Sequence, residues 1–317
     1  MVLAIGLHEV NYLAASIYVW YAFLVGIPLS DLKNEIDDIK QIVPMTKPVI
    51  CIDLAVKNLL DKKARNPAKL IGEGFDFKSC FDRNENIINK SRCSLICCIL
   101  AYIFYEYELA LQFIECCRTN SKNFRMLYIY PCFLFYDGLV LLELANAAST
   151  QELKRKEYVK IAKENLLNLR KLSNNSPHNY LNKVLLLEAE LELVQGNTQE
   201  ATSCFRQAIG LSNKHGFLLE QALALERTGI LFLKINSPES ALDSLSKCYL
   251  YYKKWGSEAK MKHLTDSYPA LAQNLPTSSS IDMELNLEDR SLATVSILTF
   301  SSTMSSFSAQ KRKAPYE

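Results

Sequence analysis

The sequence predicts an all-α fold, in which residues 1–275 form an α-solenoid of antiparallel helix pairs and residues 276–317 form a flexible tail. Three observations lead to this fold class. A spacing of small and apolar residues recurs along the chain, glycine and proline are scarce, and the composition becomes serine-rich after Pro276. Serine-rich stretches are typical of flexible linkers. Within the tail, residues 291–300 are predicted to form one short amphipathic segment.

The recurring spacing places a small residue twelve positions before an alanine, and apolar residues four and seven positions after that alanine. The three sets are Cys98, Ala110, Ile114 and Cys117; Ala189, Ala201, Phe205 and Ala208; and Gly229, Ala241, Leu245 and Cys248. Small side chains are needed where two antiparallel helices cross, and larger ones where the next pair packs. The spacing therefore predicts a tetratricopeptide-like solenoid. Alanines 162, 201 and 241 are 39 and 40 residues apart, longer than the standard repeat of about 34 residues.

Composition supports long helices and excludes some partners. The chain has 317 residues, of which 49% are hydrophobic and 22% charged, and it contains 10 Gly and 10 Pro. An all-β protein would need turn residues far more often. A formal net charge of +2 gives no overall field that would attract nucleic acid. No nucleic-acid partner is therefore expected.

The N-terminal region is predicted to form a helical hairpin followed by a third helix. Residues 10–29 are almost uncharged, and their length alone would permit a membrane span. No Lys or Arg precedes them, and Gly26 with Pro28 would end a helix there. A buried first helix is therefore favoured over a span or a signal peptide. It would pair with residues 30–42, before a helix at residues 48–60 and a loop around Gly72 and Gly74.

The second half is predicted to contain four helix pairs and a final helix. The pairs are residues 93–105 with 108–117, 131–145 with 154–172, 182–195 with 198–212, and 218–235 with 238–254. Gly196 and Gly256 are placed to end helices in the left-handed conformation. Trp255 is predicted to seal the last pair against a final helix at residues 257–267. An aromatic platform for a ligand is the alternative role for Trp255.

Motifs for catalysis or cofactor binding are missing from the sequence. There is no GxxxxGK[ST], HExxH or GxSxG motif. The four histidines are scattered, and no CxxC pair occurs among the ten cysteines. We therefore expect no enzyme activity, no cofactor and no metal, and reduced core cysteines in a cytoplasmic protein. A metal or redox site joining Cys97 or Cys98 to Cys116 or Cys117 stays open as the alternative.

One charged residue is out of place in an apolar run. Asp137 lies within the segment FLFYDGL. A buried carboxylate needs a hydrogen-bond or charge partner. We expect Asp137 to bond to a neighbouring helix in the core, with a ligand contact as the alternative.

Several segments resemble one known family. They are LIGEGFD (70–76), PCFLFYDGL (131–139), LEAELELVQGN (187–197), Ala201 with Phe205 and Ala208, and YYKKWGSEAK (251–260) followed by Leu264, Tyr268 and Pro269. The chain, from about residue 12 to 271, is similar to the helical region of multidomain signalling proteins. In these proteins a Ser/Thr-kinase-like domain and an AAA-type ATPase precede the helical region, and a GAF or PAS sensor with a histidine kinase follows it.

The resemblance implies a regulatory role, with protein partners that are ATPase, kinase or sensor domains in cis or in trans. The chain lacks both the phosphate-binding loop of the ATPase and the catalytic Asp and Asn set of the kinase. It is therefore expected to be a non-catalytic scaffold; the alternative is a fragment of a larger sensor kinase. Helical phase predicts an exposed interaction surface on the inner helices. Its residues would be Tyr102, Tyr136, Glu190 and Arg227.

Overall fold

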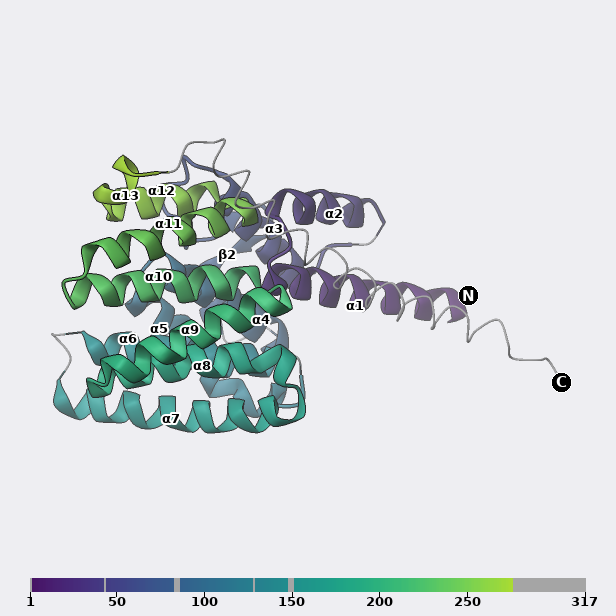
Figure 1. Cartoon of the computed structure of the whole chain (residues 1–317). Coiled ribbons are helices and arrows are strands. Elements are labelled where there is room, and N and C mark those ends of the chain that lie inside the picture. Colours follow the sequence, from purple (N-terminus) through teal and green to yellow (C-terminus); the bar gives the residue numbers. More distant parts are fainter. Residues whose placement is uncertain (1, 43, 83–85, 128, 148–150, 276–317) are drawn as a thin grey trace. The chain divides into compact units, whose positions relative to one another are not determined.

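The computed structural model describes residues 2–42, 44–82, 86–127, 129–147 and 151–275, with side chains from residue 13 onward. The predicted all-α fold is confirmed, and successive helices pack in pairs as in a solenoid (Figure 1). The described residues up to 274 form one compact unit. The predicted tail and its amphipathic segment lie outside the described residues. The helices are α1 (Val2–Val25), α2 (Leu29–Ile42), α3 (Lys47–Leu60), α4 (Ile87–Ile103), α5 (Tyr107–Asn120), α6 (Ile129–Asn146), α7 (Glu152–Asn175), α8 (Pro177–Gln195), α9 (Thr198–His215), α10 (Leu218–Lys234), α11 (Pro238–Trp255), α12 (Glu258–Ser267) and α13 (Pro269–Gln273).

The four predicted pairs in the second half are present as α4–α5, α6–α7, α8–α9 and α10–α11. Each pair also contacts the next through at least one helix, and in Figure 1 helices α7, α8, α10 and α11 follow one another from the lower edge upward. The apolar stripes of adjacent helices are thereby buried in one continuous core. The bounds differ from the predicted ones by a few residues at the helix ends, where capping decides the last turn.

The first helix is buried at its C-terminal half, as predicted. Val19, Trp20 and Phe23 are fully buried, and α1 contacts α2, α3 and α10. Among the described residues, α6 is the one helix that is both long and apolar enough to cross a membrane. Most of that segment, 72%, is buried inside the protein. Its apolar residues therefore serve the core.

The loop predicted around Gly72 and Gly74 is instead a short β-hairpin, and that prediction was wrong. Strands β1 (Ile71–Gly72) and β2 (Phe75–Asp76) pair antiparallel, with Gly72 opposite Phe75. Gly74 has φ +78°, a left-handed conformation suited to a tight turn. The hairpin leads into η1 (Phe77–Phe81), a 3-10 helix whose N-terminus is capped by Asp76. A second 3-10 helix, η2 (Ser121–Phe124), follows α5.

All the residues of the predicted packing sets lie in the interior. Gly229 shows why a small residue is needed: a Cβ atom built there would lie 2.7 Å from Cγ of Leu245, a partner within the same set. Atoms of two helices cannot approach this closely without one of them moving. These buried residues are Cys98, Ala110, Ile114, Cys117, Ala189, Ala201, Phe205, Ala208, Gly229, Ala241, Leu245 and Cys248, and Trp255 is buried as well.

Both predicted glycine caps are present. Gly196 has φ +86° and Gly256 has φ +89°. At the end of α11, the backbone N–H of Ser257 donates to the carbonyl of Tyr252 at 3.0 Å, and the N–H of Gly256 to that of Lys253 at 2.9 Å. These are the reverse-turn bonds that satisfy the last carbonyls of a helix. The cap turns the chain directly into α12.

The last helices meet the first helices. Helix α12 contacts α3, and α1 contacts α10. The ring of Trp255 lies 5.9 Å from the ring of Phe23 in α1, centroid to centroid. Ser257 Oγ donates to the carbonyl of Leu59 at 3.5 Å. Trp255 therefore joins the end of α11 to the N-terminal hairpin, a partner that the sequence did not predict.

Replacing Trp255 with alanine is expected to lower the free energy of unfolding by about 3–5 kcal/mol, because the fully buried indole would leave a cavity between α11 and α1. Chemical denaturation measures this change. The half-buried Tyr249 on the same helix provides the control, since Y249A should cost about 1 kcal/mol or less. A midpoint of W255A equal to that of the wild type would contradict the prediction.

Candidate functional site

The predicted interaction surface is not exposed, and this prediction was wrong. Tyr102, Tyr136, Glu190 and Arg227 are each only 2–3% exposed. Helical phase identified the inner faces of the helices correctly but could not show that other helices cover them. Helix α10, for example, packs against α1, α8, α9 and α11 together. The four side chains are part of the interior.

Arg227 holds three helices together through a buried ion pair network. From α10, its Nε donates to Glu190 Oε1 on α8 at 2.5 Å and one of its terminal nitrogens to Glu190 Oε2 at 3.0 Å. The guanidinium also pairs with Glu143 on α6. Burial raises the pKa of Glu190 to about 8, and the charge of Lys234 opposes this. Because both Glu190 oxygens face the guanidinium, this arrangement favours the ionised carboxylate.

A second network surrounds Lys260 and Glu226, which are 0% and 1% exposed. Lys260 Nζ on α12 donates to Glu226 Oε1 on α10 at 2.7 Å. It also donates to the carbonyl of Ile103 in the last turn of α4, where the helix dipole favours a cation. Glu226 accepts from Tyr252 at 2.8 Å and also from Tyr105. One ammonium and one carboxylate thus connect α4, α10, α11 and α12.

Asp137 makes the bonds to neighbouring helices that the sequence predicted. It pairs with Arg118 on α5 and accepts from Asn165 Nδ2 on α7 at 2.8 Å. Burial raises the pKa of Asp137, while its bonds to Arg118 and Asn165 act in the opposite direction. The carboxylate is satisfied within the core and joins three consecutive helices.

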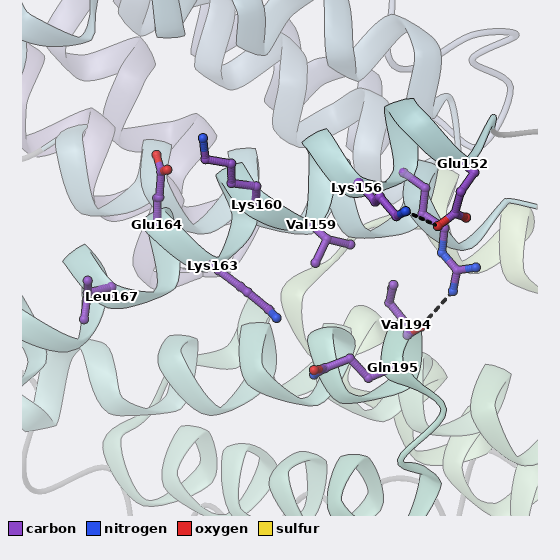
Figure 2. Close-up of a pocket in the computed structure, with 10 residues that line it drawn as sticks. Glu152, Lys156, Val159, Lys160, Lys163, Glu164, Leu167, Val194 and Gln195 are labelled. Carbon is purple, nitrogen blue, oxygen red and sulfur yellow. Dashed lines mark hydrogen bonds and ion pairs between the residues drawn. The ribbon is translucent and has the colours of Figure 1, made fainter.

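A surface groove of about 530 Å³ lies between α7 and the end of α8 (Figure 2). Its wall combines the apolar side chains of Val159, Leu167 and Val194 with a row of lysines on α7. Leu167 is 56% exposed, which is high for a leucine. The residues lining the groove are Glu152, Arg155, Lys156, Val159, Lys160, Lys163, Glu164, Leu167, Val194 and Gln195.

The cations of the groove differ in whether they have partners. Lys156 pairs with Glu152 at 3.5 Å, and Arg155 donates to the carbonyl of Val194 at 2.9 Å. Lys160 and Lys163 have no ion-pair or hydrogen-bond partner among the described residues. Figure 2 shows their ammonium groups on opposite sides of α7, with that of Lys163 toward α8. Nothing in the sequence motifs indicated this groove, because it depends on how α7 lies against α8.

Metal binding finds no support in the part of the chain that the structure describes. No group of three or more His, Cys, Asp or Glu side chains there is placed to hold an ion. His178 and His215 approach each other, with Nδ1 and Nε2 3.4 Å apart, but two imidazoles alone do not form a metal site. The ten cysteines are all free thiols.

Comparison with known proteins gives one similarity. No family profile and no solved structure matches the chain. Over 189 residues it is 28% identical to the "Peroxide stress-activated histidine kinase mak3" of Schizosaccharomyces pombe. The aligned part is 58% of this chain but 8% of the relative. The similarity supports a signalling context. It does not extend to the relative's activity.

Replacing Lys260 with methionine is expected to lower the free energy of unfolding by about 3–5 kcal/mol, because Glu226 would remain buried without its cation. Adding E226L should restore part of the loss, and the double-mutant cycle measures the coupling. The exposed pair of Lys262 and Asp266 on the same helix provides the control, since K262M should change stability by less than about 1 kcal/mol. Equal effects of K260M and K262M would contradict this assignment.

His263 is expected to make the protein less stable in acid. Burial, followed by the charge of Lys260, lowers the pKa of His263 from 6.5 to about 3. The unfolded chain therefore binds a proton that the folded chain excludes, so stability decreases as the pH falls from about 6.5 toward 3. H263F, which keeps an aromatic ring beside Phe104 and Tyr105, should lose less stability over that range. Parallel curves of unfolding free energy against pH would contradict this.

Proposed function

We propose that this chain is a non-catalytic helical interaction module in cytoplasmic signal transduction. Its partners would be ATPase, kinase or sensor domains, located in the same polypeptide or in separate chains. The observation that carries the proposal is the groove between α7 and α8, where exposed apolar surface lies beside Lys160 and Lys163. The similarity to a histidine kinase supports the signalling context.

The chemistry of the groove indicates the kind of segment that it would bind. Its four basic side chains outnumber its two acidic ones, and its apolar residues lie between them. An amphipathic helix inserts apolar residues into such a groove and places charges at the rim. The complementary segment is therefore an acidic amphipathic helix supplied by the partner domain. The rim charges would set orientation and association rate more than the affinity itself.

The double variant K160E/K163E is expected to reduce partner binding about tenfold, because two attractive contacts become repulsive. The tagged full-length chain is expressed in its native cells, and the recovered ATPase, kinase or sensor domain is quantified by mass spectrometry. Lysine cross-linking of the wild type should join Lys160 or Lys163 to an acidic segment of that domain. Recovery should also fall with rising salt.

The matched control is K154E/K171E, which makes the same change in charge on the same helix. Both lysines are exposed and lie outside the groove. Equal recovery with the two double variants would contradict the groove as the binding surface. Failure to recover any such domain would contradict the proposed partners.

A second candidate is a segment of a multidomain sensor kinase or ATPase whose catalytic domains lie outside this chain. The share of the relative that the alignment covers, 8%, favours this candidate. The molecular mass of the protein made in its native cells distinguishes the two candidate functions. An immunoblot band much larger than 36.0 kDa would support the multidomain protein, and a band at that size would support the separate module.

A further inference from the structure

The outer face of α1 is apolar, like the face that packs on the rest of the protein. On the inner face, Trp20 and Phe23 are fully buried. On the outer face, Leu13 is 52% exposed and Val25 is 41% exposed. The outward side of a surface helix normally carries charged side chains, but the sequence has none between residues 10 and 25. The outer face of α1 is therefore exposed apolar surface.

The apolar positions of this face follow a heptad spacing. From residue 3 to residue 24, seven apolar or aromatic residues recur in alternating steps of four and three. They are Leu3, Leu7, Val10, Ala14, Ile17, Tyr21 and Leu24. A spacing of this kind forms a continuous stripe on a helix that packs against a second helix. We call these seven positions the α1 stripe.

The part of the stripe whose side chains are described is accessible. Ala14 and Tyr21 are exposed, and Ile17 and Leu24 are half-buried. Figure 1 shows the N-terminal turns of α1 extending beyond the other helices of the compact unit. A helix of 24 residues is about 36 Å long. Contiguous apolar surface of this kind marks an interaction site, unlike scattered single leucines.

We propose that the α1 stripe is a dimer interface, on which a second copy of this chain packs its own α1. A two-fold interface requires a surface that is complementary to itself. The uncharged stripe meets this requirement, because it places no charge opposite an identical charge. Flanking charges select a different partner helix in coiled coils, whereas here the flanking residues Leu13 and Val25 are apolar.

Ala14 lies at the centre of the stripe. With two stripes aligned over residues 3–24, residue 14 of one copy lies beside residue 14 of the other, whether the helices run parallel or antiparallel. The distance between packed helices depends on the side chains at the contact, and a small residue there allows a close approach. Gly229 has the same role where α10 crosses α11.

A lipid surface fits the stripe less well than a second copy does. Helices that lie in a membrane interface carry Lys and Arg on their polar face, and α1 contains neither residue. The stripe is one helix wide, which is narrow beside the about 800 Å² per partner of a standard interface. We therefore expect a weak dimer that depends on protein concentration.

Sedimentation velocity of the full-length chain over a range of concentrations tests the proposal. The wild type should shift from 36.0 kDa toward twice that mass as its concentration rises. A14E and A14K should each weaken association at least about tenfold, because two like charges would lie together in an apolar interface. A mixture of A14E with A14K should associate again, because the charges then pair. Circular dichroism checks that the variants keep their helices.

A matched pair of leucine variants provides the control. L13E, beside the stripe, should also weaken association, whereas L153E on α7 should not, although Leu153 is 81% exposed. This proposal does not rest on the groove between α7 and α8, so K160E/K163E should leave the dimer unchanged. Added salt should also leave it intact, because apolar contacts are not screened as the groove charges are.

Three results would overturn the proposal. The first is a wild type that stays monomeric at every concentration. The second is A14E that associates as strongly as the wild type, which would place the interface elsewhere. The third is a chain that is monomeric in solution and binds phosphatidylcholine vesicles through the stripe, with binding lost in A14E, which would make a lipid surface the occupant.

Discussion

The buried pair of Lys260 and Glu226 is the interaction on which the arrangement of the helices most depends. A solenoid built from nearest-neighbour pairs has two free ends, but here the last helices return to the first. The ammonium of Lys260 completes the C-terminus of α4 and neutralises a carboxylate on α10. Neither charge could stay in the interior without the other. The ion pair therefore fixes where α12 must lie.

Two other buried charges also join helices that are neighbours in the stack. Arg227 binds carboxylates from α6 and α8, and Asp137 binds groups from α5 and α7. Apolar packing alone would tolerate small shifts of one helix along another, whereas a bonded charge pair has one favourable position. These ion-pair networks therefore fix the position of one helix pair along the next. The residues of these networks join neighbouring helices and are mostly buried.

The proposed binding surface therefore lies on the outer helices. Helix α7 packs against α6 and α8 and presents lysines and Leu167 beside α8. This exposed groove is the surface that we propose binds a helix of another domain.

The sequence by itself determined the helices, their pairing and the glycine caps, because helical period, small residues at crossings and left-handed glycines act over short distances. Gly229 is an example, because a Cβ atom at this position would collide with Leu245. Only the tertiary structure decided that Tyr102 and Glu190 are covered and that Trp255 contacts Phe23. These outcomes depend on segments far apart in the chain, whose meeting is set by the summed packing of all the helices between them and leaves no local pattern.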